Sequence, residues 1–377
     1  MKVKDICNLQ NGRAFKPDDW GSEGLPIVRI QNLNDESAPF NYFDGEYNSV
    51  HEINDGELLF SWSGTPGTSF GAFRWYRGKG LLNQHIFRVM PKINVDKDYL
   101  KFALNGNIGT IISKAHGGVG LQHITKKELD EVEIPIPSVE DQHVIVSTLQ
   151  RIEALISLRR KELQALDDLI KARFVEMFGT IHDNKFGYEI RTIQDVCEPI
   201  KDGTHQTPEY TEDTENGFKF LSSKDVTSGK IDWDHLKYIP DHLHEALYAR
   251  IAPRKGDLLL AKNGTTGIAA IVDRDEVFDI YVSLALLRPK SVDSTYLWGA
   301  VNAQETKEQF DASLKGIGVP NLHLGEIKKT KIIVPPMDKQ LEFSAFVSQV
   351  DKSKFAVQKA LDEAQTFFDS LMQKYFG

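Results

Sequence analysis

The segment from Leu58 to Val95 has the residue types best suited to bind an anion. It contains no aspartate or glutamate. Its basic side chains are interleaved with aromatic ones: Arg74, Arg77, Lys79, Arg88 and Lys92, with Trp62, Phe70, Phe73, Trp75, Tyr76 and Phe87. Lys and Arg neutralise phosphate charge, which supplies much of the affinity of proteins for DNA. The pattern indicates a DNA-contacting surface, although a solvated strand with core aromatics between its charges would produce it too.

Several motifs that would indicate catalysis are absent from the sequence. There is no Gly-x-x-x-x-Gly-Lys-Ser/Thr loop to bind a nucleotide, and no Gly-x-Gly-x-x-Gly opens a helix. The Asn/Asp-Pro-Pro-aromatic signature of adenine methyltransferases is also missing, because VPPM at 334–337 lacks both the amide and the aromatic residue. We therefore expect no catalytic residue in this chain.

Residues that could bind a metal are present but poorly arranged. His235, His242 and His244 are close in sequence, yet no His-Glu-x-x-His occurs, and the segment 234–244 is typical of a polar loop. Metal sites need three or four convergent ligands, and two cysteines, Cys7 and Cys197, are too few for structural zinc or a disulfide framework. We expect no metal ion, and we expect both thiols to be buried.

Length and composition limit the kind of protein. A chain of 377 residues suggests two or three domains, at about 150 residues per domain. No apolar run is long enough to span a membrane, and the first residues do not resemble a signal peptide, so we expect a cytoplasmic protein. The net charge of −9 alone argues against a DNA-binding protein, but the distribution of charge decides this question.

The sequence contains an internal repeat, and the elements that would position a DNA-contacting surface must belong to it. Six segments recur in the same order: DIC at 5–7 and DVC at 195–197, LPIVRIQNL at 25–33 and FKFLSSKDV at 218–226, GELLFSWSGTPG at 56–67 and GDLLLAKNGTTG at 256–267, IFRVMPK at 86–92 and ALLRPK at 285–290, GGVGLQHI at 117–124 and IGVPNLHL at 317–324, and IPSVEDQ at 136–142 and VPPMDKQ at 334–340. Such self-similarity predicts two copies of one structural unit.

Each copy runs into a long segment of helical periodicity that ends in Phe-Gly. Apolar residues recur alternately three and four positions apart, which is typical of a coiled-coil seam. The predicted seam consists of Leu149, Ile152, Ile156, Leu163, Leu166, Ile170, Met177, Val347, Val350, Val357, Leu361, Ala364, Phe368, Leu371 and Tyr375. Arg159, Arg173 and Lys354 interrupt the seam, but their long stems can cover apolar surface while the charges reach water.

Neither helix can bury its stripe alone, so we expect the two to pair. We favour antiparallel pairing because it lets the chain return; each helix could reach roughly 57 Å at about 1.5 Å per residue. The predicted fold class is α+β: two tandem mixed α/β domains separated by two long helices that form an antiparallel coiled coil with pseudo-two-fold symmetry. The predicted boundaries are domain 1–141, helix 142–179, domain 180–339 and helix 340–377.

Within the globular units, short apolar runs between Gly, Pro, Asn and Asp turns predict more strand than helix. Helices are expected at about 97–114 and about 293–313. The loops SGTPG at 63–67 and NGTTG at 263–267 each follow an apolar strand. Such a loop can bring backbone amides close to a phosphate, or it can be a plain hairpin turn.

The sequence resembles the specificity subunits of type I restriction-modification systems over essentially its whole length. The motifs that carry the resemblance are VKDIC and IQDVC, DGTHQTPEY at 202–210, FLSSKDVTSGKID at 220–232, GDLLLAKNGTTG at 256–267, and IPIPSVEDQ and IVPPMDKQ before the two helices. The paired Pro-x-x-x-x-Gln helix starts are the most specific of these. The resemblance implies that each globular unit is a target recognition domain for one half of a split, asymmetric DNA site, and that the helix pair is the spacer.

The resemblance and the chemistry of base edges together imply DNA contacts. Asn and Gln suit adenine edges, while Arg and Lys suit guanine edges or phosphates. The predicted DNA-binding residues are Arg13, Lys16, Trp62, Ser63, Thr65, Arg74, Arg77, Asn83, Gln84 and His85 in the first unit, and Lys201, His205, Gln206, Thr207, Ser222, Ser223, Lys224, Lys262, Asn263 and Thr265 in the second. An ordinary polar loop is the alternative for each.

The resemblance also implies the partners. Modification subunits, which would carry S-adenosylmethionine and the methyl-transfer site, would bind this chain together with double-stranded DNA, and a motor-nuclease restriction subunit would join for cleavage. No cofactor is expected in the chain itself. The alternative is a scaffold or decoy that binds modification subunits without reading DNA, and a second alternative is an autonomous enzyme acting on nucleic acid.

Overall fold

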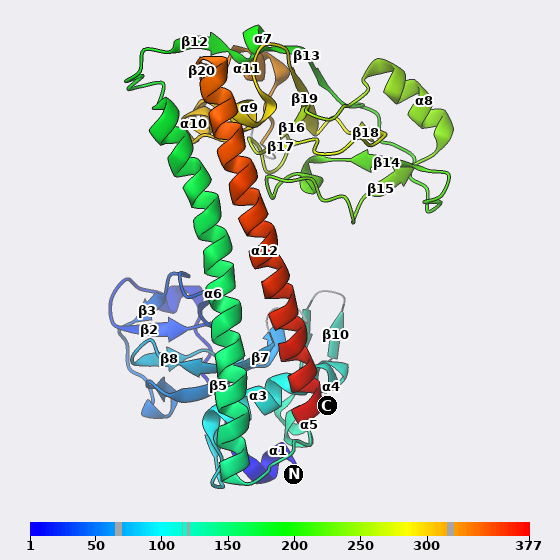
Figure 1. Cartoon of the computed structure of the whole chain (residues 1–377). Helices are drawn as coiled ribbons and strands as arrows, with labels where there is room; N and C mark the ends of the chain where they lie inside the picture. The colour runs from blue at the N-terminus through cyan, green and yellow to red at the C-terminus, as the bar shows by residue number, and fades with distance from the viewer. Residues whose placement is uncertain (65–69, 115, 119–120, 315–319) are drawn as a thin grey trace. The chain divides into compact units, whose positions relative to one another are not determined.

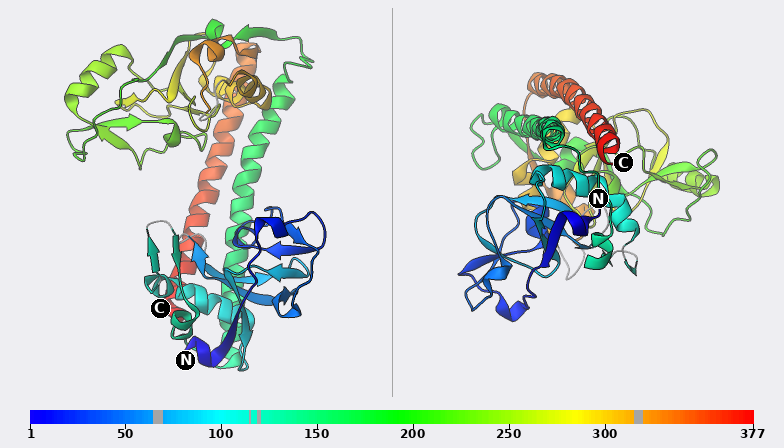
Figure 2. Two further views of the ribbon diagram at one scale, coloured as in Figure 1. Left: turned by 180° about the vertical axis from the view of Figure 1, so that it is seen from behind. Right: turned by 90° about the horizontal axis from the view of Figure 1, so that it is seen from below.

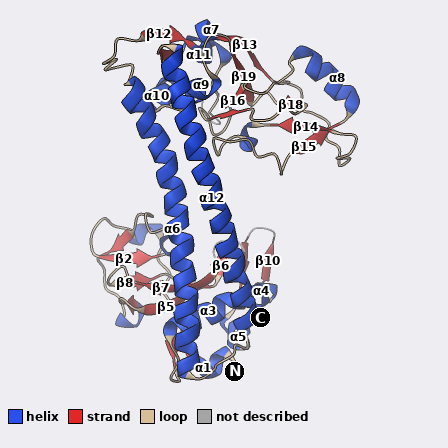
Figure 3. Cartoon of the chain, in the orientation of Figure 1, coloured by secondary structure: helices blue, strands red, loops and turns tan. Residues whose placement is uncertain are grey.

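The computed structural model describes residues 1–64, 70–114, 116–118, 121–314 and 320–377, and it divides into two compact units (Figure 1). The first unit comprises Met1–Arg160 with Lys359–Gly377, and the second comprises Lys161–Gln358. The two long helices, α6 (Val139–Phe178) and α12 (Met337–Phe376), therefore each contribute one half to each unit. Within these described ranges, the strands lie in the globular parts, as Figure 3 shows.

The described residues of the first unit's globular part form three sheets. Their orders are β1-β9-β5-β7, β3-β2-β8-β4 and β10-β11-β6. The strands are β1 (Cys7–Asn11), β2 (Leu25–Val28), β3 (Asn41–Phe43), β4 (Glu52–Ile53), β5 (Glu57–Ser61), β6 (Ser63–Gly64), β7 (Gly71–Trp75), β8 (Gly80–Leu82), β9 (Ile86–Pro91), β10 (His116–Gly118) and β11 (Leu121–His123). The helices are α1 (Val3–Ile6), α2 (Ile30–Asn34), α3 (Lys97–Gly106), α4 (Ile108–Ser113) and α5 (Lys126–Asp130), with 3-10 turns η1 (Pro17–Asp19) and η2 (Ser49–His51).

In the second unit, outside the undescribed 315–319, the globular part also forms three sheets, with the orders β13-β19-β16-β17, β15-β14-β18 and β12-β20. The strands are β12 (Glu189–Thr192), β13 (Cys197–Asp202), β14 (Phe218–Leu221), β15 (Lys237–Ile239), β16 (Leu258–Ala261), β17 (Ala269–Ile271), β18 (Phe278–Ile280), β19 (Leu284–Pro289) and β20 (Lys331–Val334). The helices are α7 (Ile193–Val196), α8 (Asp241–Arg250), α9 (Ser294–Val301), α10 (Gln304–Ser313) and α11 (Leu324–Lys329), with the 3-10 turn η3 (Ser223–Asp225).

The two units share one plan, as the repeat predicts. The antiparallel sheet β1-β9-β5-β7 of the first unit corresponds to β13-β19-β16-β17 of the second. The parallel pair β2–β8 corresponds to the parallel pair β14–β18. The central strands β5 and β16 are buried along their whole length, which explains their unbroken apolar runs. The predicted α+β class and the two mixed domains are confirmed.

Both helices expected in the globular units are interrupted. The segment predicted at about 97–114 forms α3 and α4, and the segment at about 293–313 forms α9 and α10. The first break falls at Asn107 after Gly106, two residues of low helix propensity. At the second break the side chain of Asn302 bonds to both the N–H and the C=O of Ala269, at 2.9 and 3.0 Å. Side chains of this type compete with the helical hydrogen bonds.

Within each unit α6 and α12 lie side by side and antiparallel (Figures 1 and 2). In the first unit residues early in α6 share a buried cluster with residues late in α12: Leu149, Ile152 and Ile156 with Ala364, Leu371 and Phe376. In the second unit the order is reversed: Ile170 and Phe174 with Phe343, Val347 and Val350. Of the remaining predicted seam residues Val357 is buried, and the others are half-buried: Leu163, Leu166, Met177, Leu361, Phe368 and Tyr375. No helix in the described ranges has an apolar stretch that could cross a membrane.

Two cations that interrupt the seam have partners on the other helix. The ammonium of Lys354 pairs with the carboxylate of Asp167. The guanidinium of Arg173 lies 3.3 Å from Glu342 and 5.6 Å from the ring centroid of Phe346. Both side chains therefore cover the apolar stripe with their stems and hold the opposite helix with their charges.

The Gln of each Pro-x-x-x-x-Gln motif joins a long helix to its globular part. Gln142 is 1% exposed; its Oε1 accepts from the N–H of Asp96 at 2.9 Å, and its Nε2 donates to the C=O of Pro137 at 3.0 Å. Gln340, 2% exposed, makes the equivalent bonds with Asp293 and Pro335, both at 2.8 Å. Asp96 and Asp293 are the N-caps of α3 and α9, so one carboxamide links the starts of two helices in each unit.

The helices begin earlier than predicted and end in aromatic contacts. Ser138 caps α6 by accepting from the N–H of Asp141 at 3.2 Å, so the helix starts before Gln142. The final phenylalanines pack on equivalent tyrosines. The ring centroids of Phe376 and Tyr99 are 5.5 Å apart, and those of Phe178 and Tyr296 are 5.1 Å apart. Each globular part thus holds the start of one long helix and the end of the other.

Both cysteines are buried, as predicted. Burial raises the pKa of the Cys7 thiol to about 12 and that of Cys197 to the same value. The two residues occupy corresponding first positions of β1 and β13. They are inert core residues in the folded chain at neutral pH.

The Gln340 bonds predict a measurable loss of stability in Gln340→Leu. The substitution would leave the Asp293 N–H and the Pro335 C=O without partners in the interior, which costs about 1–3 kcal/mol. Gln142→Leu should behave alike in the first unit. Denaturant unfolding of the full chain measures the effect, with Gln150→Leu as the matched control, because Gln150 is exposed on α6. Equal midpoints for Gln340→Leu and the control would contradict the prediction.

Candidate nucleic-acid interface

In each unit the chain crosses between two sheets at a short turn. The turn 83–85 joins β8 to β9, and the turn 281–283 joins β18 to β19. Three further segments meet each turn, so that four loops gather at one edge. We call these the loop edges: 12–15, 29–31, 62–64 and 83–85 in the first unit, and 203–206, 222–224, 262–264 and 281–283 in the second.

The same backbone hydrogen bonds hold both loop edges together. In the first unit they are Gly12 N to Ile86 O (3.2 Å), Arg13 N to Leu82 O (2.8 Å), Asn83 N to Val28 O (3.1 Å) and Trp62 N to His85 O (3.2 Å). In the second they are Gly203 N to Leu284 O (3.3 Å), Thr204 N to Ile280 O (3.1 Å), Tyr281 N to Leu221 O (2.8 Å) and Lys262 N to Ser283 O (2.9 Å). One backbone frame is therefore built twice.

The side chains carried by the two frames differ at nearly every position. The corresponding pairs, first unit then second, are Arg13 and Thr204, Arg29 and Ser222, Ile30 and Ser223, Gln31 and Lys224, Trp62 and Lys262, Ser63 and Asn263, Asn83 and Tyr281, Gln84 and Val282, and His85 and Ser283. The two loop edges therefore share their backbone hydrogen bonds but differ in the polar side chains that they carry. Such an edge can present two different hydrogen-bonding patterns to two ligand surfaces.

The glycines at the start of each loop edge are required by close approach. A Cβ on Gly12 would lie 2.2 Å from the carbonyl oxygens of Leu82 and Asn83, and one on Gly203 would lie 1.9 Å from that of Ile280. No other residue fits where the segment crosses the parallel strand. The Asn-Gly and Asp-Gly pairs at 11–12 and 202–203 therefore follow from the frame.

The first loop edge combines rings with polar groups. Trp62 stacks on Phe87 at 5.6 Å and lies 5.2 Å from His85. Arg13 donates to the C=O of Glu46 at 3.0 Å and lies 4.6 Å from the Phe43 ring. Gln84 is exposed, and Asn83 and His85 are half-buried. Burial lowers the pKa of His85, which favours its neutral ring.

The basic side chains of this stretch are engaged by carboxylates and backbone carbonyls from elsewhere in the chain. Arg74 lies 3.3 Å from Asp98, and Lys79 lies 2.9 Å from Glu52. Arg77 donates to the C=O of Asn32 at 3.1 Å and packs 4.2 Å from the Phe40 ring. The absence of acidic residues between Leu58 and Val95 is therefore a property of the sequence and not of the surface. Neither Arg74 nor Arg77 belongs to the loop edge.

The remaining predicted contacts of the first unit lie near the edge. Lys16 is exposed at the N-cap of η1. Ser63 is 9% exposed and pairs with His123 of β11. Thr65 and most of the SGTPG loop lie outside the described residues.

A buried ion pair anchors the second loop edge. Lys262 is 5% exposed, and its Nζ lies 3.2 Å from Oδ2 of Asp202. Asp202 also lies 3.1 Å from Nε2 of His205 and 3.3 Å from Arg250. In the first unit Asn11 and Trp62 hold the same positions, and Trp62 Nε1 donates to Asn11 Oδ1 at 3.2 Å. At this position, therefore, the side chain of each unit, Trp62 or Lys262, bonds to the last residue of β1 or β13, Asn11 or Asp202.

The other predicted contacts of the second unit are mostly accessible. The exposed members are Lys201, His205, Gln206, Thr207, Lys224 and Thr265, and the half-buried members are Ser222, Ser223 and Asn263. Lys201 donates to the C=O of Arg250 at 3.3 Å. The Asn263 backbone bridges to that of Asn321, and the side-chain oxygens of both residues have no hydrogen-bond partner within the described chain. These two buried oxygens are acceptors that the described part of the chain leaves unused.

Of the three histidines in the segment 234–244, His244 forms a buried structural contact, while His235 and His242 are exposed. The expected loop contains β15 and the start of α8. His244 is 9% exposed, lies 2.7 Å from Asp279 Oδ2 and stacks on Phe218 at 3.6 Å. Burial raises the pKa of Asp279. The described residues contain no cluster of three His, Cys, Asp or Glu side chains able to hold a metal ion.

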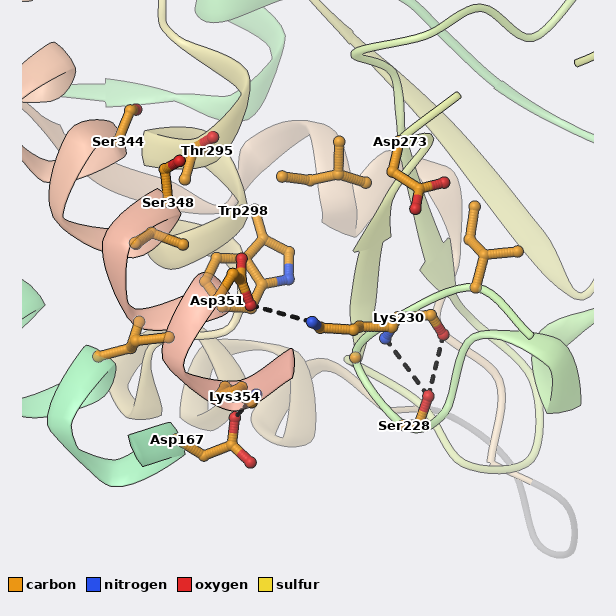
Figure 4. A pocket seen from close by; sticks show the side chains of 15 residues that line it. Asp167, Ser228, Lys230, Asp273, Thr295, Trp298, Ser344, Ser348, Asp351 and Lys354 are labelled. Atoms are coloured by element: carbon orange, nitrogen blue, oxygen red, sulfur yellow. Dashed lines mark hydrogen bonds and ion pairs between the residues drawn. The ribbon is translucent and has the colours of Figure 1, made fainter. Parts of the chain in front are cut away.

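A cavity of about 480 Å³ lies in the second unit, between its globular part and the helices α6 and α12 (Figure 4). Trp298 lines it, and Lys230 reaches 2.9 Å from Asp351 of α12. The Lys354–Asp167 pair lies at its rim. None of the predicted contact residues in the described ranges lines this cavity, so it is separate from the loop edge.

Several loop-edge residues were missed by sequence reasoning, among them Arg29, Gln31 and Tyr281. These three lie just after strands that pair in parallel, β2 with β8 and β14 with β18. The repeat contains the signal for Arg29 and Gln31, because LPIVRIQNL aligns with FKFLSSKDV, whose Ser222 and Lys224 were predicted as contacts. Tyr281 corresponds to Asn83 in the same way.

Comparison with known proteins identifies the kind of chain. The model of the family described as type I restriction modification DNA specificity domain matches residues 1–168 and 186–364. The EcoBI specificity subunit of Escherichia coli is 21% identical over 401 residues, covering 99% of this chain and 83% of that protein. The MjaVIII specificity subunit of Methanocaldococcus jannaschii is 24% identical over 390 residues, covering 96% and 89%.

Solved structures share the fold. The crystal structure of a type I restriction-modification S subunit from M. genitalium superposes with a TM-score of 0.54 and 16% identity, covering 100% of this chain and 95% of that one. A chain from a structure describing complex assembly and conformational transition of a type I restriction-modification system gives a TM-score of 0.57 with 17% identity, covering 100% and 96%.

The Asp202–Lys262 pair predicts that Asp202→Asn destabilises the second unit strongly. The change keeps the side-chain shape but leaves the buried Lys262 ammonium without its counter-charge, which costs about 3 kcal/mol. Thermal unfolding with a probe in each unit would measure this loss. Asn11→Ala is the matched control in the first unit and should cost only about 1 kcal/mol, because it removes one neutral hydrogen bond. Equal effects of the two variants would show that the ion pair is not the anchor described.

Proposed function

The chain belongs to the type I restriction-modification DNA specificity family, and from this premise we propose that it reads a split, asymmetric DNA target. The family is the DNA-recognition component of restriction-modification complexes. Each unit would recognise one half-site through its loop edge, and the chain would direct partner subunits to that target.

One observation carries the proposal: the same backbone frame occurs in both units with different side chains. A repeated frame supports a repeated task, because equal loops present their side chains to a ligand in the same way. Different side chains select different base edges. The two half-sites should therefore differ in sequence, and the whole target should not be a palindrome.

The helix pair supports the role of a spacer. Each helix has 40 residues and contributes to both units, with starts and ends fixed in the globular parts by buried contacts. Half-sites must lie on reachable faces of the duplex, about one helical turn apart or a multiple. The pair of helices suits this requirement, because the number of residues in α6 and α12 sets its length.

The chain is proposed to act without catalysing a reaction itself. Modification subunits would bring S-adenosylmethionine and the methyl-transfer site, and a restriction subunit would bring the motor and nuclease. These partners would join the chain on DNA in the cytoplasm. The net charge of −9 supports a clamp completed by modification subunits, so binding of DNA by the isolated chain should be weak and sensitive to salt.

Single-molecule sequencing of methylated adenines tests the proposal. A host that carries the gene should methylate a bipartite motif that disappears when the gene is deleted and returns when it is restored. Co-purification of modification subunits would be measured in parallel. If those subunits bind the chain but no motif depends on it, the chain is a scaffold or decoy and the proposal is wrong.

Matched insertions in the helix pair test the spacer. Seven residues, two turns, inserted after Arg160 in α6 and after Gln358 in α12 would lengthen both helices by about 10 Å and keep the seam in phase. The half-sites should be unchanged, while the gap between them should grow by about three base pairs at 3.4 Å each. The same insertion in α6 alone is the control and should abolish methylation. An unchanged gap after the matched insertion would contradict the spacer role.

A further inference from the structure

A cavity of about 310 Å³ opens at the loop edge of the first unit. It lies at the carboxyl ends of β2 and β8, which are neighbouring parallel strands. Parallel strands deliver the loops that follow them to one edge of the sheet, and such edges are frequent ligand sites. Here those loops are Arg29–Gln31 and Asn83–His85, and all six residues line the cavity.

Carboxamides dominate the polar groups of the cavity. Gln31 and Gln84 are exposed, and Asn83 is half-buried between them in the lining. The amide oxygens of Gln31 and Gln84 accept no hydrogen bond from a described residue. Gln84 Nε2 lies 3.2 Å from Nε2 of His85, so the ring can hold the carboxamide in place without consuming its oxygen. A carboxamide presents one donor and one acceptor side by side, which few ligand edges match.

Among the described residues that line the cavity, the one Arg or Lys is Arg29, and it is already engaged. Arg29 donates from Nη1 to Asn41 Oδ1 at 3.1 Å, and its guanidinium lies 4.8 Å from the ring centroid of Trp20. Trp20 is 38% exposed at the rim. The guanidinium is therefore held against an aromatic face. The amide oxygens of Gln84 and Gln31 are left for a ligand, while Nε2 of Gln31 donates to the C=O of Pro39 at 3.4 Å. This arrangement favours a neutral ligand edge with alternating donor and acceptor over a phosphate.

We infer that this cavity receives the major-groove edge of one adenine in the half-site read by the first unit, with Gln84 and Gln31 as its specificity-determining residues. The inference rests on the proposed function and names its ligand. Asn and Gln pair bidentately with adenine, the side-chain oxygen accepting from N6 and the nitrogen donating to N7. Guanine offers two acceptors at the same edge and cannot satisfy the amide oxygen.

The second unit cannot use the same contact. The positions of Gln31 and Gln84 are held there by Lys224 and Val282, and that of Asn83 by Tyr281. The amine and the apolar side chain offer no acceptor to the adenine N6, and the single hydroxyl of Tyr281 cannot make the bidentate contact of a carboxamide. The adenine contact should therefore be confined to one half-site, and this difference gives the experiment an internal control.

The experiment uses the modification enzyme assembled from the full chain and its modification subunits. Methylation rates are measured on duplexes that carry each base at each position of the first half-site. Gln84→Ala and Gln31→Ala should reduce the preference for adenine at one position about ten- to hundredfold and leave the second half-site unchanged. Asn34→Ala is the matched control, because Asn34 is an exposed carboxamide at the far end of α2 and does not line the cavity.

A chemical probe keeps the test independent of protein folding. Replacing that adenine by 7-deazaadenine removes N7 and should slow the unaltered enzyme, while Gln84→Ala should respond less, because its partner atom is already lost. If both glutamine variants retain every base preference, or if the altered position prefers guanine, the inference is overturned while the two half-sites are still read. If no methylation motif depends on the chain at all, the proposed function fails and the inference fails with it.

Discussion

Each of the two 40-residue helices carries an apolar stripe that only the other helix and a globular part can cover. This constraint forces residues early in α6 to meet residues late in α12 in the first unit, and the reverse in the second. The paired helices are then attached by equivalent buried groups: Gln142 and Gln340 at their starts, and Phe376 and Phe178 at their ends. The frame that carries each loop edge is built on these attachments, so its orientation to the helices in its own unit is fixed by packing and by two hydrogen bonds.

The loop edges separate stability from recognition. Backbone hydrogen bonds and a glycine at each close crossing hold the frame, and these are the same in both units. The side chains that project from the frame differ, because they contribute little to holding it. Trp62 and Lys262 are the instructive exception: both bond inward at 3.2 Å, one to a carboxamide and one to a carboxylate, and so belong to the frame as much as to the surface. A site on a rigid frame can change its ligand without losing its fold.

Much of this arrangement could be predicted from periodicity and repetition. The seam residues, the two domains and about half of the loop-edge positions follow from patterns that are local or that recur at a fixed offset. Ion pairs between residues far apart in the sequence could not be predicted in this way. Arg74 and Lys79 are neutralised by Asp98 and Glu52, which are close only after folding. The interruption of the second predicted helix accompanies the hydrogen bonds of Asn302 to a neighbouring strand. Arg29 and Gln31 gained importance only when the parallel pairing of β2 with β8 placed them beside Gln84.

Transfer of one loop edge onto the other frame tests the central claim most directly. The second unit would receive the first unit's side chains at the exposed corresponding positions, and the methylated motif would be determined by single-molecule sequencing. If the frame is shared and the side chains choose the bases, the second half-site should become a copy of the first, and the target should turn into an inverted repeat. Retention of the original second half-site, in a folded and methylating enzyme, would contradict the account.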